Sequence, residues 1–178
     1  SIIIQLLRMS VLIYIDQAEG QIKKSSFEEA SYGAKLAEQT GTSAEALVLG
    51  NVSDDLSALG KYGIKKVHHV ADAQLDHLDA QLFIKVIAEA ASASKADIIV
   101  ISANVNGKAI APGLSARLKA GLVAGAVALP DTSNGFVVKK GVFSGKAFAN
   151  IRIISPIKII SLTPNAFTPV LGDGVAEV

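Results

Sequence analysis

The chain has 178 residues, half of them hydrophobic, with 17 Lys and Arg, 16 Asp and Glu, and no cysteine. A chain of this length forms about one domain. Its apolar content and net charge of +1 exclude intrinsic disorder, and the lack of cysteine excludes a disulfide framework and a cysteine zinc site. The charge balance also argues against a nucleic-acid partner or binding to an anionic membrane surface.

The mean hydropathy of +0.42 is high, yet no stretch of about 18 uninterrupted apolar residues exists, so membrane insertion is not expected. Short apolar runs are typical of strands that are buried on both faces. Residues 1–8 precede Met9, the only methionine, and fit a secretory signal poorly because their one basic residue follows the apolar part. We expect them to be an upstream extension or a cloning remnant outside the folded domain.

The first two thirds of the chain alternate between predicted strands and helices. The strands span residues 10–16, 44–50, 66–71 and 96–102. The helices span residues 25–41, 53 to Gly60 or Gly63, 78–92 and 107–120. This alternation indicates parallel βαβ units rather than a β-sandwich, and the last of the four strands, as the most apolar, is expected at the centre of the sheet.

Two of these helices begin with capping signals. A serine followed three residues later by Glu28 or Glu29 predicts a capping box at the start of the first helix. Ser53 is predicted to cap the second, with Asp54 and Asp55 in its first turn, where carboxylates suit the helix dipole. All four carboxylates are interpreted as capping or solvated charges.

The last third has short apolar runs without helical periodicity, and Asn134–Gly135 is a two-residue turn signal. Predicted strands, some in antiparallel pairs, span residues 121–129, 135–140, 144–154 and 157–163. The predicted fold class is α/β: a doubly wound, mainly parallel Rossmann-like sheet in residues 9–163, with antiparallel strands added in the C-terminal third. Residues 164–178 carry no clear element and are expected to be a tail or linker.

Ligands of a doubly wound sheet bind at the carboxyl ends of its strands, near the topological switch. After the first strand, residues 16–20 contain no Gly-x-Gly-x-x-Gly, so an ordinary surface turn is expected there. After the fourth strand, Asn104, Asn106, Gly107 and Lys108 precede a helix, whose amino terminus favours anions. They form a candidate phosphate-binding loop, although Asn and Gly are equally what a tight strand-to-helix turn requires.

No catalytic or metal-binding residue is predicted. Residues 141–146 resemble a P-loop superficially, but the spacing is one residue short and a strand follows. His68 and His69 are neighbours on a strand and so point to opposite faces, while His77 is isolated, which argues against a metal site. The apolar segment 121–129 is interpreted as a buried strand, with contact to a partner subunit as the alternative.

Three segments, taken in chain order, carry a family resemblance. They are Gly107–Val123, which contains Ala-Arg-Leu and Gly-Leu-Val; Lys140–Ala149, a predicted strand pair around Ser-Gly-Lys-Ala; and Ile159–Phe167, which closes with Pro-Asn-Ala-Phe. Together they resemble the N-terminal domain of the alpha subunit of electron transfer flavoproteins, from Met9 to about Phe167. Lys108-Ala109 stands where that family has Arg-Asp, and Thr163 stands where it has arginine before proline.

The resemblance implies the adenine nucleotide alpha hydrolase-like form of the Rossmann fold. It also implies a second domain, expected beyond Val178, that holds most of the FAD contacts, so no cofactor-binding residue is expected within this chain. Pairing with a beta subunit is implied, as is a flavin that relays electrons from acyl-CoA and other dehydrogenases toward the respiratory chain. The nucleotide loop of the beta subunit, Asp-Gly-Asp and Gln-Val-Gly, is missing after the fourth strand, which favours alpha over beta and argues against bound AMP.

The expected location is a bacterial cytoplasm, or the mitochondrial matrix for a eukaryotic protein. Two alternatives stay open. One is a stand-alone adenine-nucleotide-binding module that uses the loop from Asn104 to Lys108, for which calorimetry with AMP and ATP is the test. The other is a purely structural or regulatory domain.

Overall fold

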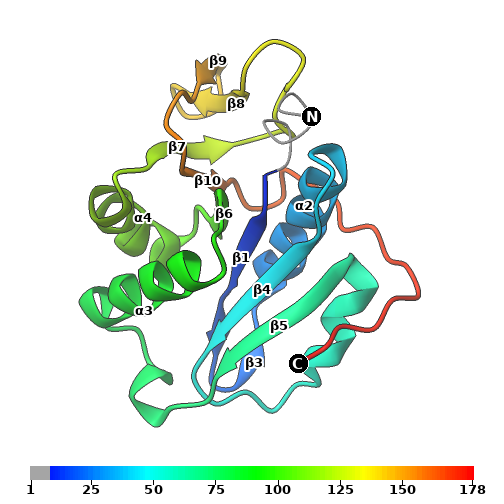
Figure 1. Cartoon of the computed structure of the whole chain (residues 1–178). Helices are drawn as coiled ribbons and strands as arrows, with labels where there is room; N and C mark the ends of the chain where they lie inside the picture. Colours follow the sequence, from blue (N-terminus) through cyan, green and yellow to red (C-terminus); the bar gives the residue numbers. More distant parts are fainter. Residues whose placement is uncertain (1–8) are drawn as a thin grey trace.

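Eight strands form one sheet in the order β5-β4-β1-β6-β10-β7-β8-β9 (Figure 1). The computed structural model describes residues 9–178, so the expectation for residues 1–8 lies outside the described residues. The strands are β1 (Val11–Ile15), β4 (Ala44–Leu49), β5 (Ile64–Val70), β6 (Ile98–Ser102), β7 (Gly121–Ala126), β8 (Val137–Val142), β9 (Ala147–Arg152) and β10 (Lys158–Leu162). A small separate hairpin consists of β2 (Gln17–Ala18) and β3 (Gln21–Ile22).

The strands from β5 across to β7 run parallel, β8 pairs antiparallel with β7, and β9 pairs antiparallel with β8. β6 lies between β1 and β10, and all five of its side chains are buried, which confirms the expected central position. The predicted class, a doubly wound and mainly parallel sheet with antiparallel strands in the C-terminal third, is therefore confirmed.

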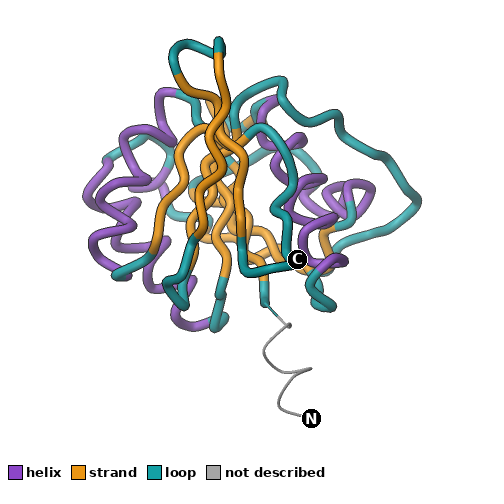
Figure 2. The backbone as a smooth tube through the Cα atoms, turned by 90° about the horizontal axis from the view of Figure 1, so that it is seen from above, coloured by secondary structure: helices purple, strands orange, loops and turns teal. Residues whose placement is uncertain are grey.

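Helices cover both faces of the sheet (Figure 2). They are α2 (Lys24–Gln39), η1 (Leu56–Tyr62), η2 (Ala73–Leu75), α3 (Ala80–Ala93) and α4 (Val105–Leu118). Side chains alternate along a strand, so Val11 and Ile13 of β1 join the core beneath α2, while Leu12 and Tyr14 join the core beneath α3 and α4. This two-sided burial explains why the strands appear in the sequence as unbroken apolar runs.

Both predicted helix caps are wrong. The N-cap of α2 has no side-chain hydrogen bond, because Ser26 lies inside the first turn and its Oγ accepts from the amide of Asp16 (2.7 Å) instead. At η1 the N-cap is Asp55, whose side chain accepts from a helix amide, whereas Ser53 donates to the carbonyl of Gly20 (3.1 Å). In each case tertiary contacts compete with the local capping pattern.

Asn134–Gly135, the predicted turn signal, does lie in a turn, which Asp131 and Val137 close by antiparallel pairing, but the connection is longer than two residues. These residues lie in the longer loop between β7 and β8, and the tight hairpin is formed by residues 143–146, between β8 and β9. The segment that resembles a P-loop is thus a hairpin turn. β7 lies between β10 and β8, so residues 121–129 do form a strand over Gly121–Ala126, although only Val123 and Ala126 of this strand are buried.

The segment after β10 crosses α2 and η1 and ends at the outer edge of β5 (Figure 1). The amide of Val67 donates to the carbonyl of Glu177 (2.7 Å), the amide of Glu177 donates to the carbonyl of Lys65 (3.0 Å), and Ala176 is buried against η1. We name residues 164–178 the tail. That the tail leads toward an FAD-binding domain stays a prediction.

Candidate functional site

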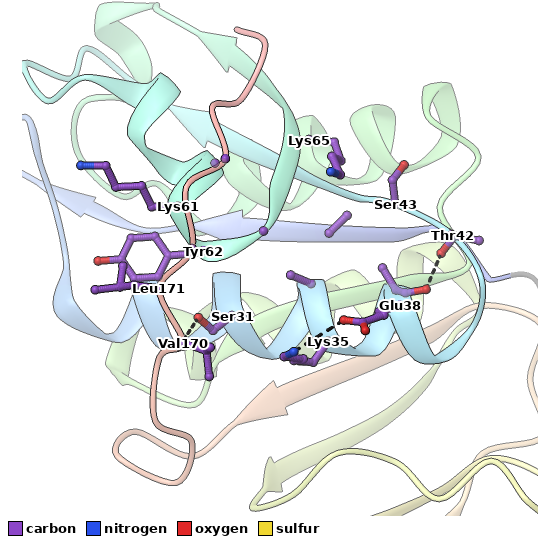
Figure 3. A pocket seen from close by; sticks show the side chains of 17 residues that line it. Ser31, Lys35, Glu38, Thr42, Ser43, Lys61, Tyr62, Lys65, Val170 and Leu171 are labelled. Atoms are coloured by element: carbon purple, nitrogen blue, oxygen red, sulfur yellow. Dashed lines mark hydrogen bonds and ion pairs between the residues drawn. The ribbon is translucent and has the colours of Figure 1, made fainter.

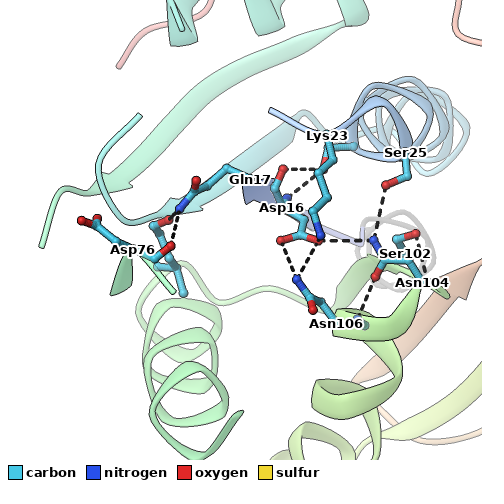
Figure 4. Close-up of polar contacts among 11 residues, drawn as sticks. Asp16, Gln17, Lys23, Ser25, Asp76, Ser102, Asn104 and Asn106 are labelled. Carbon is cyan, nitrogen blue, oxygen red and sulfur yellow. Dashed lines mark hydrogen bonds and ion pairs between the residues drawn. The ribbon is translucent and has the colours of Figure 1, made fainter. Parts of the chain in front are cut away.

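A buried carboxylate lies at the carboxyl edge of the sheet, where the parallel strands end. Asp16 follows β1, and its side chain is only 5% exposed. Lys23 Nζ lies 2.9 Å from Asp16 Oδ2, Asn104 Nδ2 donates to the same oxygen (3.3 Å), and Asn106 Nδ2 lies within 3.4 Å of both oxygens (Figure 4). We name Asp16, Lys23, Asn104 and Asn106 the Asp16 cluster.

The fold brings these residues together because β1 and β6 are neighbouring parallel strands whose carboxyl ends meet. Asn104 follows β6 and caps α4, its Oδ1 accepting from the amide of Gly107 (2.9 Å). Gly107 has to be glycine, since a Cβ there would collide with the carbonyl oxygen of Ser102. The cap and the glycine hold both asparagine amides toward Asp16.

The structure brings three of the four predicted loop residues to this place. Asn104 and Asn106 donate to Asp16, and Gly107 is held by the cap, whereas the side chain of Lys108 is exposed on the first turn of α4. The carboxylate of Asp16 therefore accepts the side-chain hydrogen bonds of Asn104 and Asn106 that a bound phosphate would otherwise accept. Binding of an anion by this loop stays a prediction.

The Asp16 cluster does not fit the pyrophosphate of a flavin dinucleotide. The connection from β1 to α2 is the β2–β3 hairpin rather than a glycine-rich loop, and Asp16 places a negative charge at the amino end of α4. The side-chain amides of Asn104 and Asn106 that could hold a pyrophosphate already donate to the carboxylate of Asp16.

Two glutamates on α2 were interpreted from the sequence as capping or solvated charges, and this interpretation is wrong. Glu28 is buried, and its Oε2 accepts from the amide of Asn165 (2.9 Å), which holds the start of the tail. Glu29 is 1% exposed, and neither of its carboxyl oxygens has a hydrogen-bond partner among the described residues. Burial raises the pKa of Glu29 well above its ordinary value, and the charges of Asp16 and Glu28 raise it further.

The neighbouring histidines contact different parts of the chain, in agreement with their predicted opposite directions. His68 Nε2 lies 3.4 Å from Glu45 Oε2, and His69 Nε2 lies 2.8 Å from the carbonyl oxygen of Gly50. Within residues 9–178 there is no group of three or more His, Cys, Asp or Glu that could hold a metal ion. Nor is any helix of this part of the chain long and apolar enough to cross a bilayer.

Sequence reasoning missed a cavity of about 480 Å³ between α2, η1 and the tail (Figure 3). Two polar contacts lie in its wall: Lys35 pairs with Glu38 (3.6 Å), and Ser31 Oγ accepts from the amide of Val170 in the tail (3.0 Å). The cavity exists because the tail folds back over α2. No signal for it was available in a segment whose composition predicts a linker.

Sequence reasoning also missed an exposed apolar surface at the β9 side of the sheet. The hairpin of β8 and β9 (residues 137–152) exposes 79% of Phe143 and 58% of Phe148, and 87% of Ile154 is exposed just beyond it. Residues 135–157 contain four exposed or half-buried basic side chains and no acidic one. Exposed aromatic side chains among charges of one sign are typical of a protein–protein contact.

The fold and the site define a Rossmann-like α/β domain without an assembled catalytic group among its described residues. Comparison with known proteins gives the family: the electron transfer flavoprotein domain matches residues 11–178, and the chain belongs to this family.

The chain is 27% identical to Protein FixB of Clostridium saccharobutylicum, with 92% of this chain and 50% of that protein covered. It is 29% identical to the electron transfer flavoprotein subunit alpha of Clostridium acetobutylicum, with 79% and 43% covered. It is also 29% identical to the lactate dehydrogenase (NAD(+),ferredoxin) subunit LctC of Acetobacterium woodii, with 79% and 34% covered. The chain spans half or less of the length of these relatives.

Proposed function

We propose that this chain is the N-terminal domain of an electron transfer flavoprotein alpha subunit, which acts as scaffold and as contact for a beta subunit in an FAD-containing electron carrier. The observation that carries the proposal is the family match over residues 11–178 together with relatives that are named alpha subunits. The order of the three resembling segments along the chain supports alpha rather than beta.

In this proposal FAD belongs to the complete heterodimer, and most of its contacts come from outside this chain. The flavin supplies the redox chemistry when bound, and this domain supplies position and surface. The misfit of the Asp16 cluster to a pyrophosphate supports this division of roles. The chain is then part of an electron carrier rather than an enzyme with catalytic residues of its own. Its donors are acyl-CoA and other dehydrogenases, and its location is a bacterial cytoplasm, which the bacterial sources of the relatives support.

The β8–β9 hairpin is the surface that suits the beta subunit best. Phe143 and Phe148 are exposed, and Lys139 Nζ lies 4.4 Å from the ring centroid of Phe148, so a cation and an aromatic face are presented together. β9 is also the last strand of the sheet, and its outer backbone groups are open to another strand or loop. Aromatic side chains that become buried centrally contribute most to binding.

The test is co-expression of this chain with the electron transfer flavoprotein beta subunit from the same genome, followed by light scattering of the purified product. We expect a one-to-one complex for the unchanged chain. Replacing Phe143 and Phe148 together by serine should weaken it by about 2 kcal/mol or more. Val105→Ser, which changes a side chain that is 83% exposed on α4, is the control and should bind normally.

The outcomes separate the two parts of the proposal. If the unchanged chain does not bind the beta subunit, the proposed function is wrong. If it binds and the serine variant binds equally well, only the assignment of the contact to the hairpin is wrong.

A further inference from the structure

A second cavity, of about 520 Å³, lies at the amino edge of the sheet, where the parallel strands begin. This is the opposite edge from the Asp16 cluster. Its walls come from the start of β10, the end of α2 and the loops that flank β8 and β9. The lining residues are Met9, Gln39, Thr40, Thr132, Gly135, Phe136, Ile153 and Lys158.

Lys158 is the unusual member of this lining. It is the first residue of β10 and is 7% exposed, although lysine is among the residues that are least often buried. Its Nζ donates to the carbonyl oxygen of Ser155 (2.6 Å) and lies 5.4 Å from the ring centroid of Phe136. An ammonium group has three donors, and this is the single hydrogen bond that it makes within the described part of the chain.

A carboxylate partner for Lys158 is missing from residues 9–178, since no ion pair within 4.0 Å involves it. The nearby carboxylate is that of Asp97, but Asp97 Oδ2 accepts from the amide (3.1 Å) and the hydroxyl (3.4 Å) of Ser10. Burial lowers the pKa of Lys158, and Asp97 opposes this effect only in part. A buried cation is costly unless a counter-charge is present.

The remaining polar groups of the lining are already paired. Gln39 Nε2 donates to the carbonyl of Pro130 (2.8 Å) and to Thr132 Oγ1 (3.1 Å), and Thr40 Oγ1 donates to the carbonyl of Met9 (3.0 Å). A ligand in this cavity would therefore contact mainly apolar side chains and the ammonium group of Lys158, which has no ion pair within the described residues. That combination suits a small molecule with an apolar body and a single carboxylate.

We propose that the cavity beside Lys158 is a binding site for a small organic carboxylate, whose carboxylate pairs with Lys158 Nζ while its apolar part packs against Phe136 and Ile153. The site lies at the opposite edge of the sheet from the Asp16 cluster, and its residues Phe136 and Ile153 directly flank the β8–β9 hairpin. It is thus a further binding function, and it does not depend on the proposed role in electron transfer.

Sodium benzoate is a suitable probe, and benzyl alcohol has the same ring without the charge. With the full chain labelled with nitrogen-15, benzoate titration should shift the amide signals of Phe136, Ile153 and Lys158, whereas benzyl alcohol should bind about tenfold more weakly. Lys158→Met keeps the length of the side chain and removes the charge, and it should weaken benzoate binding by about tenfold or more. Lys140→Met, on β8, is the matched control and should bind benzoate as the unchanged chain does.

Three results would overturn the proposal. They are benzoate shifts that map outside this cavity, equal binding of benzoate and benzyl alcohol by the unchanged chain, and undiminished binding of benzoate by the Lys158→Met variant. The first two use only the unchanged chain, so they decide the matter even if the variant folds poorly.

Discussion

Glu29 is the residue whose environment departs furthest from that of an ordinary surface carboxylate. It lies in the second turn of α2, is 1% exposed, and faces the negative charges of Asp16 and Glu28. Because these factors raise its pKa in the folded chain, the fold favours the protonated form of Glu29. Glu29 therefore sets a dependence of stability on pH that is separate from any binding.

The first prediction concerns Glu29→Gln, which keeps the shape of the side chain and replaces the ionisable carboxyl group by a neutral amide. Below the ordinary glutamate pKa of 4.5, the carboxyl is protonated in both the folded and the unfolded chain. As the pH rises above that value, only the unfolded chain ionises, so the unchanged protein loses stability that the variant keeps. In urea unfolding at pH 8, we expect the variant to be more stable by about 1 to 2 kcal/mol, with the difference vanishing near pH 4.

Glu38→Gln is the matched control, since Glu38 lies on the same helix with 75% of its side chain exposed. It should change the unfolding free energy by less than about 0.5 kcal/mol at either pH. A Glu29→Gln variant that is less stable by the same amount at both pH values would show that the buried carboxyl is not protonated in the fold.

Glu28 and Glu29 also show where sequence reasoning fails at the residue scale. A serine followed three residues later by glutamate matches a capping box, and the local pattern contains nothing that distinguishes a cap from a buried acid. The capping box is prevented by Asp16, which lies ten residues before Ser26 in the sequence. The backbone amide and carbonyl of Asp16 both hydrogen-bond to the hydroxyl of Ser26. Burial of the glutamates follows from the tail and from neighbouring strands, which are distant in sequence.

At the scale of elements, the amino end of α4 joins a helix cap to the Asp16 cluster. Asn104 accepts from the amide of Gly107 through Oδ1 and donates to Asp16 through Nδ2. Asn104→Ala should therefore lower the unfolding free energy by about 2 kcal/mol, because a cap and a contact with a buried carboxylate are lost together. Thermal and urea unfolding measure the loss.

Asp79→Ala is the matched control for this prediction, since Asp79 caps α3 through the amide of Leu82 (3.2 Å) and is exposed. We expect a loss of about 1 kcal/mol, the usual cost of an N-cap. Equal losses in the two variants would mean that the hydrogen bond from Asn104 to Asp16 adds nothing to stability.

The tail provides a second prediction at this scale. A Cβ on Gly60 would collide with the backbone of Val175 and Ala176, and backbone cannot yield as a flexible side chain can. Gly60→Ala should release the end of the tail from η1 and β5, so the amide of Glu177 should exchange with solvent about tenfold faster or more. Gly172→Ala, whose Cβ would lie 3.8 Å from the nearest atom, is the control and should leave that exchange unchanged.

The elements themselves were largely predictable, and the reason is the two-sided burial of the sheet. Residues Ile98–Ile101 are all apolar because helices cover both faces of the sheet, and this pattern predicted the central position of β6. The strand predicted over residues 144–154 begins inside the tight turn at residues 143–146, which carries a weaker local turn signal than Asn134–Gly135. The path of the tail was not predictable, since scattered hydrogen bonds, among them those to Ser31, Lys65 and Val67, hold it and no periodic pattern marks them.

Over the whole molecule, charge is distributed unevenly. The chain carries a net charge of +1, yet residues 135–157 contain four basic residues and no acidic one, so the rest of the chain is net negative. The two ends of the parallel sheet differ as well: Asp16 pairs with Lys23 at one edge, whereas at the other Lys158 has no ion pair within residues 9–178. The positive hairpin and the site beside Lys158 are therefore the places where partners of negative charge are expected.

The last prediction follows from the charge of the hairpin and rests on the proposed beta-subunit contact. Replacing Lys139 and Lys146 by glutamate should slow association with the beta subunit by about tenfold at low ionic strength, because long-range attraction steers the encounter. Raising the ionic strength to about 0.3 M should remove most of the difference, since charges further apart than a Debye length are screened. Stopped-flow measurement of association rates gives both values.

The matched control is the replacement of Lys24 and Lys85 by glutamate, which changes the net charge by the same amount on exposed positions of α2 and α3. If steering depends on the hairpin, this variant associates at nearly the unchanged rate. If both variants slow association equally, net charge rather than the β8–β9 hairpin governs the encounter, and the hairpin has no special place in it.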